Sequence, residues 1–406
     1  MKILLVHNSY QQHGGEDSVF DAERKLLSTR GHRVCVYKRH NDEIKNYGLL
    51  RKSTLPLRTL WAWDSAAEIR RIIGYEQPDV VHFHNTFPLI SPAAYYACKD
   101  AGLPVIQSLH NPRLICPAAT LHRDGNACLD CLNKTLSWPG VLHGCYRESH
   151  IQTGVVAGML AVHRHLRTWH ETVDTYIVFT DFYRQLFVQA GLPPAKIKIK
   201  PHFITPDPGA TSTAQEYALF VGRLAPEKGV LTLLKAWTRL SSIPLKIRGD
   251  GPLETEVRRL HPASNVVLTP RLSREDLTTL FHGARFLVWP SDGYYETFGL
   301  AAAHAFACGI PVIASRIGVM AEIVRDGATG LLFNPGDPDD LAAKVLWAWE
   351  NRKQMAELGA AARIEYERKY QADSNYERLL EIYSRACDCK SRKASQLWSA
   401  IEQDSM

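Results

Sequence analysis

Two series of short, continuous apolar runs, each followed by a helical stretch, dominate this chain. In the first half the runs lie at residues 2–7, 33–37, 80–84, 105–109 and 176–180. Strands of a parallel sheet carry helices on both faces, so they are apolar throughout and do not alternate with polar residues. The first half therefore predicts a parallel sheet with helical crossovers, one of which is residues 17–29.

The pattern starts again after residues 206–215, a segment rich in Pro, Gly, Ser and Thr that we interpret as a linker. The second series of runs lies at residues 217–221, 245–248, 266–268, 286–289 and 311–314. Two such series predict an α/β fold of two doubly wound, Rossmann-like domains that face each other across a cleft. The predicted domains are residues 1–205, with a cysteine-rich insertion at 112–150, and residues 216–375.

Net charge and the apolar pattern limit the partners and the compartment. A formal net charge of +6 is mild, so it suits anionic partners such as phosphates or lipid headgroups and does not demand nucleic acid. No apolar stretch reaches the roughly 18 residues of a membrane-spanning helix, and the start lacks the pattern of a secretory signal. Together with an odd count of nine cysteines, these features predict a cytoplasmic protein without disulfides.

Glycines and charged residues follow the predicted strands, where a parallel sheet binds its ligands. Gly14 and Gly15 would let a ligand approach backbone amides at the start of a helix; the alternative is a plain turn. Arg223 and Lys228 follow the first strand of the second series, where two cations could neutralise a diphosphate; the alternative is a solvated turn. Gly249 begins a Gly-Asp-Gly-Pro turn after the next strand.

Residues 290–300 are the most informative segment of the chain. Glu296 lies just before a predicted helix that is rich in small residues. Its carboxylate can accept hydrogen bonds from sugar hydroxyls. The backbone amides of Phe298, Gly299 and Leu300 would face a phosphate at the positive end of that helix.

In order and spacing, four motifs of the second half resemble those of the family-4 retaining glycosyltransferases, which have the GT-B fold. They are Gly-Arg-Leu-x-x-x-Lys-Gly from 222, Gly-Asp-Gly-Pro from 249, Glu-x-Phe-Gly-Leu from 296 and Ala-Cys-Gly-x-Pro-Val from 307. The resemblance spans residues 1–385 and includes Gly14, Gly15 and His110. It implies C-terminal helices that cross back to the first domain, with residues 376–406 packing on it. The polar end of that segment predicts a helix that frays.

The resemblance also implies an activity. A sugar would pass from a nucleotide-diphosphate donor to a glycan or lipid-linked acceptor, with retention of configuration and without a required cofactor. Surface polysaccharide or glycolipid biosynthesis, including lipopolysaccharide, would be the process served. A GT-B epimerase or phosphorylase would share the fold but not all four motifs.

The resemblance implies roles for the residues that match the family's motifs. Arg223 and Lys228 would grip the diphosphate, aided by the Gly14-Gly15 backbone. Glu296 would bind the sugar hydroxyls. His110 would lie near the anomeric centre, and its alternative is a buried histidine at a strand end. Retention by front-face attack would let the leaving phosphate take the acceptor's proton, so charge stabilisation would matter more than a protein base.

His304 is the main departure from the family pattern, which has a second glutamate eight residues after the first. A carboxylate accepts from both ribose hydroxyls, whereas a neutral imidazole offers one acceptor and one donor. We expect weaker ribose binding; the stronger alternative is a nucleotide-sugar-binding protein with impaired transferase activity. His202 stands where an asparagine is common. Asp337-Pro338-Asp339 spells a D-x-D metal motif but has the setting of a helix cap, so no catalytic metal is expected.

Four of the nine cysteines, Cys116, Cys128, Cys131 and Cys145, lie in the insertion after His110. Their spacing, with Cys-x2-Cys at the centre, suits a structural Zn²⁺ site. The alternatives are unlinked buried cysteines and a redox role; a zinc-ribbon nucleic-acid module is disfavoured by the few aromatic residues. Because the insertion follows His110, it should shape the acceptor side of the cleft.

Basic and apolar residues are mixed in two segments of the first half, residues 45–58 and 163–170. The basic residues of the first segment, which surround four leucines, are Lys45, Arg51, Lys52 and Arg58. Such a surface predicts peripheral contact with an anionic membrane, at the inner face for a cytoplasmic protein. The alternative is a solvated face with ordinary core contacts.

Overall fold

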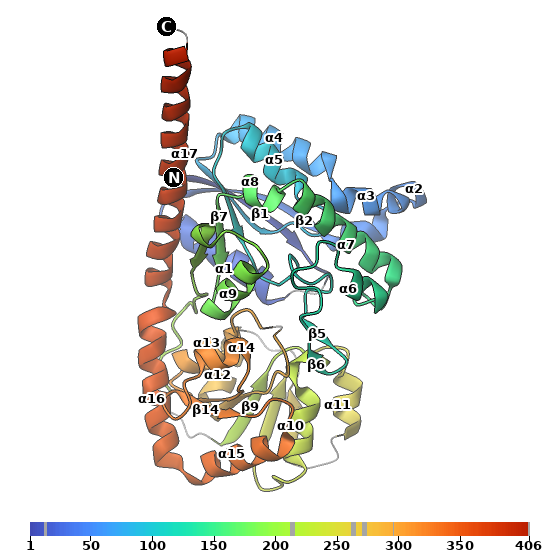
Figure 1. The fold of residues 1–406 in the computed structure, drawn as a ribbon. Coiled ribbons are helices and arrows are strands. Elements are labelled where there is room, and N and C mark those ends of the chain that lie inside the picture. Colours follow the sequence, from blue (N-terminus) through green and yellow to red (C-terminus); the bar gives the residue numbers. More distant parts are fainter. Residues whose placement is uncertain (12–13, 212–215, 261–264, 270–273, 295, 405–406) are drawn as a thin grey trace.

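The computed structural model describes residues 1–11, 14–211, 216–260, 265–269, 274–294 and 296–404. The chain forms two six-stranded sheets, one above the other in Figure 1. The strands of the first sheet are β1 (Lys2–Ser9), β2 (Arg33–His40), β3 (Val80–Asn85), β4 (Val105–Ser108), β7 (Thr175–Val178) and β8 (Ile197–Ile199). Those of the second are β9 (Tyr217–Val221), β10 (Leu245–Arg248), β11 (Val266–Thr269), β12 (Ala284–Trp289), β13 (Val312–Ser315) and β14 (Gly330–Phe333).

Every strand pair in the two sheets is parallel, as the continuous apolar runs predict. The strand orders are β2-β1-β3-β4-β7-β8 and β11-β10-β9-β12-β13-β14. In each sheet the chain reverses its direction of travel beside the first strand, between β1 and β3 and between β9 and β12. Such a switch point opens a crevice at the carboxyl ends of the strands. The two sheets therefore each offer one crevice for a ligand.

Helices cover the faces of both sheets, which explains why their strands are apolar on both sides. In the first half they are α1 (Gly15–Thr29), α2 (Leu49–Ser53), α3 (Leu55–Leu60), α4 (Trp63–Glu76), α5 (Ala93–Asp100), α6 (Trp138–Leu142), α7 (His150–His165), α8 (Thr168–Glu171) and α9 (Asp181–Gln189). In the second half they are α10 (Val230–Trp237), α11 (Glu254–Leu260), α12 (Arg274–His282), α13 (Leu300–Ala307), α14 (Gly318–Ile323) and α15 (Pro338–Glu350). In β1, residues Ile3 to Val6 are all fully buried.

All ten predicted strands are present within three residues of their predicted ends, but four strands were not predicted. Two of these, β8 and β14, are the outermost strands on the same side of each sheet. The others, β5 (His122–Arg123) and β6 (Asn126–Ala127), pair as an antiparallel hairpin in the insertion. Two residues per strand are too few to leave a periodic signal in a sequence. Part of the predicted linker, residues 212–215, lies outside the described residues.

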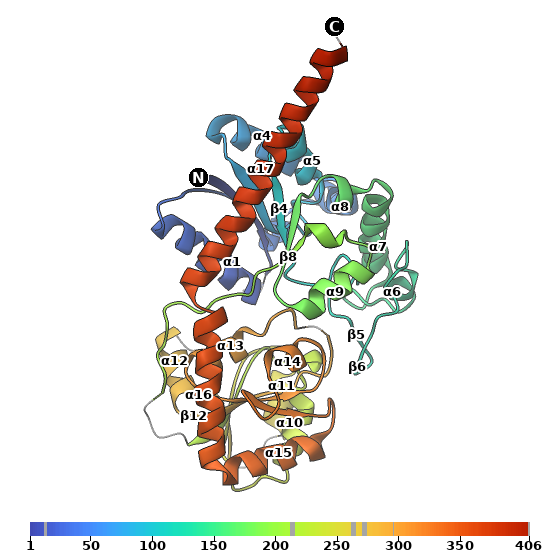
Figure 2. The same ribbon diagram turned by 60° about the vertical axis from the view of Figure 1, so that its left-hand side comes forward.

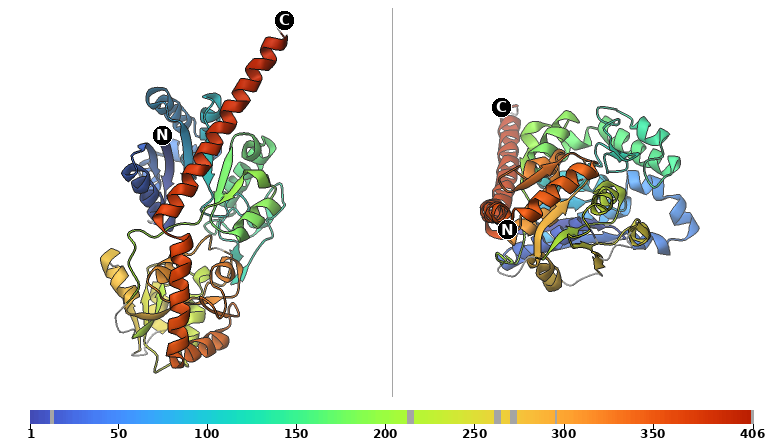
Figure 3. Two further views of the ribbon diagram at one scale, coloured as in Figure 1. Left: turned by 90° about the vertical axis from the view of Figure 1, so that its left-hand side faces the viewer. Right: turned by 90° about the horizontal axis from the view of Figure 1, so that it is seen from below.

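Two C-terminal helices, α16 (Arg352–Lys369) and α17 (Ala372–Asp404), form a column beside both sheets (Figures 2 and 3). α16 packs on α13 of the second half, whereas α17 packs on α1 and β4 of the first. Tyr383 of α17 is fully buried, and its hydroxyl lies 2.8 Å from Nδ1 of His82. The predicted return of the C-terminal helices to the first half is thus confirmed. The last two residues, where the predicted fraying was centred, lie outside the described part.

Candidate active site

Loops from the carboxyl ends of the two sheets meet between them. Thr297 Oγ1 donates a hydrogen bond to the backbone carbonyl of His110 at 3.1 Å. The backbone amides of Asp181 and Phe182 each donate to the Glu322 carboxylate at 2.8 Å. The first bond holds the segment that follows β4 against the segment that precedes α13, and the other two join the start of α9 to α14. Residues predicted from separate halves of the sequence therefore share one cleft.

Glu296 is a half-buried carboxylate on the donor side. Its Oε1 pairs with the Lys228 ammonium and accepts hydrogen bonds from Trp289 Nε1 and Ser291 Oγ, each at 3.2 Å. Burial opposes ionisation of this carboxyl, but the Lys228 charge and the three donors outweigh it, so the pKa of Glu296 lies below its usual range. Among the described residues these contacts all engage Oε1, which leaves Oε2 for a ligand hydroxyl.

Close backbone packing brings the Lys228 and Glu296 loops together. Gly229 has φ +65°, and a Cβ there would lie 1.8 Å from the Pro290 carbonyl oxygen. Only glycine fits such a position. Lys228, which precedes it, is thereby held against the segment that carries Glu296. Arg223 lies on the same loop with an exposed side chain, ready for an anion in the cleft.

Gly299 is fixed by both conformation and space. Its φ is +94°, and an added Cβ would lie 2.1 Å from Cη2 of Trp289. It caps the N-terminus of α13, which begins at Leu300, while the Phe298 side chain is buried and anchors the turn. Because the first amides of a helix lack intrahelical partners, a phosphate site at the start of α13 stays a prediction.

Gly249 has a structural role in the packing of its turn. A Cβ on it would lie 1.9 Å from the carbonyl oxygen of Gly222, and Leu224 N donates to Asp250 O at 2.8 Å. The residue therefore allows the Gly-Asp-Gly-Pro turn to pack on the loop that carries Arg223. Its contribution to donor binding stays a prediction.

Gly14 and Gly15 face the second half across the cleft. Gly14 is the N-cap of α1 with an extended φ of −119°, and its amide donates to Asp17 Oδ2 at 3.0 Å. A Cβ on Gly15 would lie 3.4 Å from Cδ1 of Leu300. Neither backbone conformation requires glycine, and a Cβ on Gly15 would make an ordinary contact with Leu300, so the role of the pair in donor binding stays a prediction.

His304 lies on α13 one turn after Leu300. Its ring stacks on Phe281 of α12, with centroids 4.3 Å apart and an angle of 14° between the planes. The imidazole is half-buried in this stack. A carboxylate at this position would lose the ring contact, so the departure from the family pattern is built into the packing of α12 and α13.

His110 lies between two other histidines. His84 Nδ1 is 3.0 Å from His110 Nε2, and the His202 ring is stacked at 5.6 Å on the other side. Burial, and then the neighbouring imidazoles, lower the pKa of His110 well below its usual range. The ring is therefore neutral at physiological pH, and His202, the second departure from the family pattern, supplies one of its walls.

A buried ionic cluster behind His110 was not predicted. Glu23 Oε1 lies 3.4 Å from His84 Nε2 and 3.3 Å from His82 Nδ1, while Oε2 pairs with Lys200 Nζ at 2.9 Å. All four side chains are at most 1% exposed. Burial disfavours the carboxylate, but the Lys200 charge outweighs it and keeps the pKa of Glu23 well below its usual range.

This cluster fixes the tautomers of the histidines. Burial lowers the pKa of His84 to about 3, so its ring carries one proton, which the Glu23 carboxylate attracts to Nε2. His84 Nδ1 is then an acceptor and His110 Nε2 the donor. The remaining nitrogen of His110, Nδ1, keeps its lone pair and can accept a hydrogen bond from a ligand.

Glu16 is a second residue that the sequence reasoning missed. Its carboxylate accepts hydrogen bonds from Asn85 Nδ2 at 2.9 Å and from Asn111 Nδ2 at 3.4 Å. Burial, followed by the nearby charge of Asp17, raises the pKa of Glu16 to about 8. The signal that could have found it is its place directly after Gly14-Gly15, at the start of α1.

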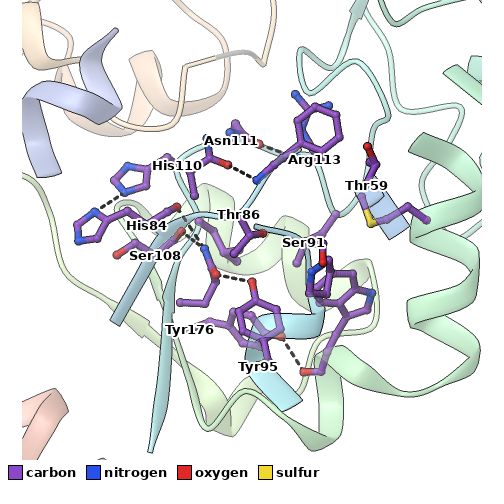
Figure 4. A pocket seen from close by; sticks show the side chains of 18 residues that line it. Thr59, His84, Thr86, Ser91, Tyr95, Ser108, His110, Asn111, Arg113 and Tyr176 are labelled. Atoms are coloured by element: carbon purple, nitrogen blue, oxygen red, sulfur yellow. Dashed lines mark hydrogen bonds between the residues drawn. The ribbon is translucent and has the colours of Figure 1, made fainter. Parts of the chain in front are cut away.

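A cavity opens on the first-half side of His110, at the ends of β3 and β4 (Figure 4). Figure 4 shows His84 and His110 at one end and the side chains of Tyr95 and Tyr176 at the other. Its polar lining includes Ser91, Gln107, Asn111 and Arg113. Asn111 and Arg113 belong to the start of the segment after β4, so that segment borders this cavity.

The other predicted polar motifs have clear positions. Asp337 caps α15, where its Oδ1 accepts from the amides of Asp339 and Asp340 at 2.9 and 3.1 Å, which confirms the predicted helix cap. The cysteines of the chain are all free thiols, and the four of the insertion line one small cavity. Within the described ranges, no helix is long and apolar enough to span a membrane.

Comparison with known proteins decides the family. Residues 13–208 match the family described as Glycosyltransferase Family 4, and residues 205–365 match that described as Glycosyl transferases group 1. The two matches adjoin and run through both sheets. The chain belongs to the family-4 glycosyltransferases.

Relatives of this family-4 chain are similar over part of their length. It is 32% identical over 153 residues to the sulfoquinovosyl transferase SQD2 of Arabidopsis thaliana, covering 37% of the chain and 30% of SQD2. It is 32% identical over 184 residues to O-antigen chain mannosyltransferase C of Escherichia coli, covering 44% and 49% of the two proteins. The chain thus spans less than half the length of these curated relatives.

Solved structures extend the likeness of this family-4 chain to both halves. Anabaena Alr3699/HepE, solved in complex with UDP and glucose, has a TM-score of 0.67 and 18% identity. The match covers 95% of this chain and 100% of that one. The predicted GT-B architecture of two Rossmann-like halves is therefore confirmed.

Proposed function

We propose that the chain transfers a sugar from a nucleotide-diphosphate donor to a glycan or lipid-linked acceptor with retention of configuration. The observation that carries this proposal is the Glu296–Lys228 pair, which is held in a cleft opposite His110. Solved HepE, of the same fold, binds UDP and glucose. The names of the relatives, an O-antigen mannosyltransferase and a sulfoquinovosyl transferase, favour surface polysaccharide or glycolipid biosynthesis.

On the donor side, Lys228 and the exposed Arg223 neutralise the diphosphate, and the amides at the start of α13 add their partial charge. Lys228 then exchanges part of its contact with Glu296 for phosphate oxygens. The Glu296 carboxylate, still held by Trp289 and Ser291, accepts hydrogen bonds from sugar hydroxyls. The leaving diphosphate is thus stabilised by charges that are in place before the donor binds.

On the acceptor side, neutral His110 accepts a hydrogen bond through Nδ1 and orients a hydroxyl of the sugar or the acceptor. The acceptor enters through the cavity of Figure 4. Its hydroxyl attacks the anomeric carbon on the face that the diphosphate leaves, and the departing phosphate oxygen takes the proton. No cofactor is required for this step.

Turnover of a panel of UDP-, GDP- and ADP-linked sugars tests the proposal. One donor should be hydrolysed slowly without acceptor and should raise the melting temperature, since a ligand of the native state stabilises it. The anomeric configuration of the product, read by NMR, should equal that of the donor. Stabilisation without any turnover would instead favour a nucleotide-sugar-binding protein, and inversion would contradict the mechanism.

A membrane-bound acceptor is supported by one surface. Leu49, Leu50 and Leu57 are 88%, 87% and 58% exposed on α2 and α3. Arg51 and Lys52 are exposed beside them, whereas Arg58 is engaged in an ion pair with Asp64. Binding to anionic but not neutral liposomes, lost in Leu49→Ser/Leu50→Ser, is expected; equal binding to both would contradict the proposal.

A further inference from the structure

The insertion after His110 contains little regular secondary structure. Between residues 112 and 149 its regular elements are the two-residue strands β5 and β6 and the five-residue helix α6. Backbone hydrogen bonds of regular structure therefore stabilise only a small part of it. Yet its turns are sharply defined, and the hairpin reaches toward the second half (Figure 1).

Backbone strain is concentrated in the same segment. Nine described residues other than glycine have positive φ, and six of them lie between residues 119 and 148. Two of these six, Ala119 at +61° and Leu121 at +49°, have side chains that do not favour this region. Such conformations are unfavourable and persist only where the surroundings force them. The insertion therefore needs a constraint that its regular structure does not supply.

The four cysteines of the insertion are placed where such a constraint would act. Cys116, Cys128, Cys131 and Cys145 all line one small cavity, although they are up to 29 positions apart. None forms a disulfide. Packing around them is tight, since a Cβ on Gly140 would lie 3.3 Å from Cys131 Sγ.

Backbone amides contact two of the sulfurs. The backbone amide of Asp130 donates to Cys128 within the Cys-x2-Cys turn, and that of Gly140 donates to Cys131. Such outer contacts orient metal ligands. Arg123, which lines the cavity, interacts with Cys128 and Cys145 and would offset the negative charge of a four-thiolate site.

We propose that Cys116, Cys128, Cys131 and Cys145 bind one structural Zn²⁺ that fixes hairpin β5–β6 against the donor-side loop. Zn²⁺ prefers four tetrahedral sulfur ligands in structural sites. Among the described residues, the one set of three ligand groups whose ligand atoms all lie within 4.8 Å is Glu23, His82 and His84. The sulfurs are thus further apart than in a metal-bound site, and Zn²⁺ draws them together, releasing the thiol protons to solvent.

Hairpin β5–β6 links the metal site to the donor-side loop that carries Gly293. The amide of Cys128 donates to the carbonyl of Leu121 at 2.8 Å, which ties the metal site to the base of β5. His122 then packs on the donor-side loop, because a Cβ on Gly293 would lie 3.1 Å from its Cδ2. Gly293 precedes Glu296 by three residues. The metal thereby fixes one edge of the cleft.

Metal content of tag-free protein tests the site without any assay of activity. Elemental analysis should give about one zinc per chain in the wild type and a loss of most of it in Cys131→Ser and Cys128→Ser. Cys389→Ser, an exposed cysteine outside the insertion, is the matched control and should keep its zinc. Wild-type zinc below about 0.3 per chain would overturn the proposal.

Thiol titration and proteolysis keep the proposal testable where a variant does not fold. In native wild-type protein, four thiols should become reactive when a chelator is added, and trypsin should then cleave at Arg123 and Lys134. Two disulfides, or four thiols that react equally without chelator, would overturn it. His122→Ala should leave the zinc content unchanged while loosening the hairpin, which separates metal binding from its effect on the cleft.

Discussion

The two sides of the cleft are built by different physical means. On the donor side, glycines with no room for a Cβ hold the loops: Gly229 against Pro290, Gly249 against Gly222 and Gly299 against Trp289. On the acceptor side, a buried ionic cluster of Glu23, Lys200, His82 and His84 lies behind His110. The first design rests on close contacts of backbone and ring atoms and tolerates no added Cβ. The second joins distant strands and depends on balanced charge.

The largest loss of stability is expected when the charge balance between Glu23 and Lys200 is broken. Glu23→Gln leaves the Lys200 ammonium buried without its counter-charge, and removing one partner of such a pair costs about 3–5 kcal/mol of unfolding free energy. Urea unfolding measures this loss. Glu254→Gln, which removes an exposed pair with Arg258, should cost less than about 0.5 kcal/mol. Glu23→Gln/Lys200→Met should regain part of the stability; no recovery would show that Lys200 is not the cause.

Substitutions on the donor side should lower the activity and leave the stability largely unchanged. Glu296→Gln keeps the shape but removes the charge that pairs with Lys228 and faces the sugar, so kcat/KM should fall about 100-fold or more. Steady-state kinetics with the donor found in the panel measures it. Trp289→Phe removes one hydrogen bond to the same oxygen and should cost about tenfold. If Glu296→Gln unfolds the protein as strongly as Glu23→Gln, the contrast between the two sides is wrong.

Acid should weaken the acceptor side through its histidines. Burial lowers the pKa of His84, His110 and His202, so each stays neutral when folded but takes up a proton when unfolded below about pH 6.5. The unfolded state then binds more protons. As the pH is lowered, the free energy of unfolding therefore decreases, by about 1.4 kcal/mol per pH unit for each histidine. The low pKa of Glu23 acts in the same direction at lower pH.

The free energy of unfolding, measured between pH 7 and 5, tests this dependence on pH. His202→Phe keeps a ring but cannot be protonated, so its slope should be smaller by one histidine's share. His143→Ala changes an exposed histidine and should leave the slope as it is. A slope unchanged in His202→Phe would remove that ring from the argument.

The smallest effect is expected at His304. In His304→Glu a carboxylate replaces the ring that stacks on Phe281, and a gain in ribose binding should lower the donor KM about fivefold. His304→Gln has similar length without charge and should lower it less. A KM equal to that of the wild type would mean that His304 does not face the ribose.

Much of the donor side could be predicted from the sequence because its signals are local. Arg223, Lys228 and Glu296 follow strands within a few residues, and the parallel topology brings such loops to one edge. Fewer residues of the acceptor side could be predicted. Glu23 lies in the middle of α1 and Lys200 just after β8, 177 positions apart, so no motif joins them. Each residue alone has the sequence setting of a solvated charge.

Short elements also escaped prediction, for a related reason. β8 has the sequence Ile-Lys-Ile and β14 has Gly-Leu-Leu-Phe, and runs of three or four residues fit a helix or a strand equally well. They become strands because an open sheet edge is available to them. The hairpin β5–β6 similarly depends on what holds the insertion, not on its own propensity.

The sequence by itself determined the two parallel sheets, their order along the chain, the helix cap at Asp337 and the family, since periodicity and motif spacing are properties of short segments. Only the tertiary structure decided which charges are buried. It paired Glu23 with Lys200, placed His84 behind His110, raised the pKa of Glu16 to about 8 and gathered four cysteines around one cavity. Burial and pairing depend on which distant residues become neighbours, and a linear pattern does not contain that information.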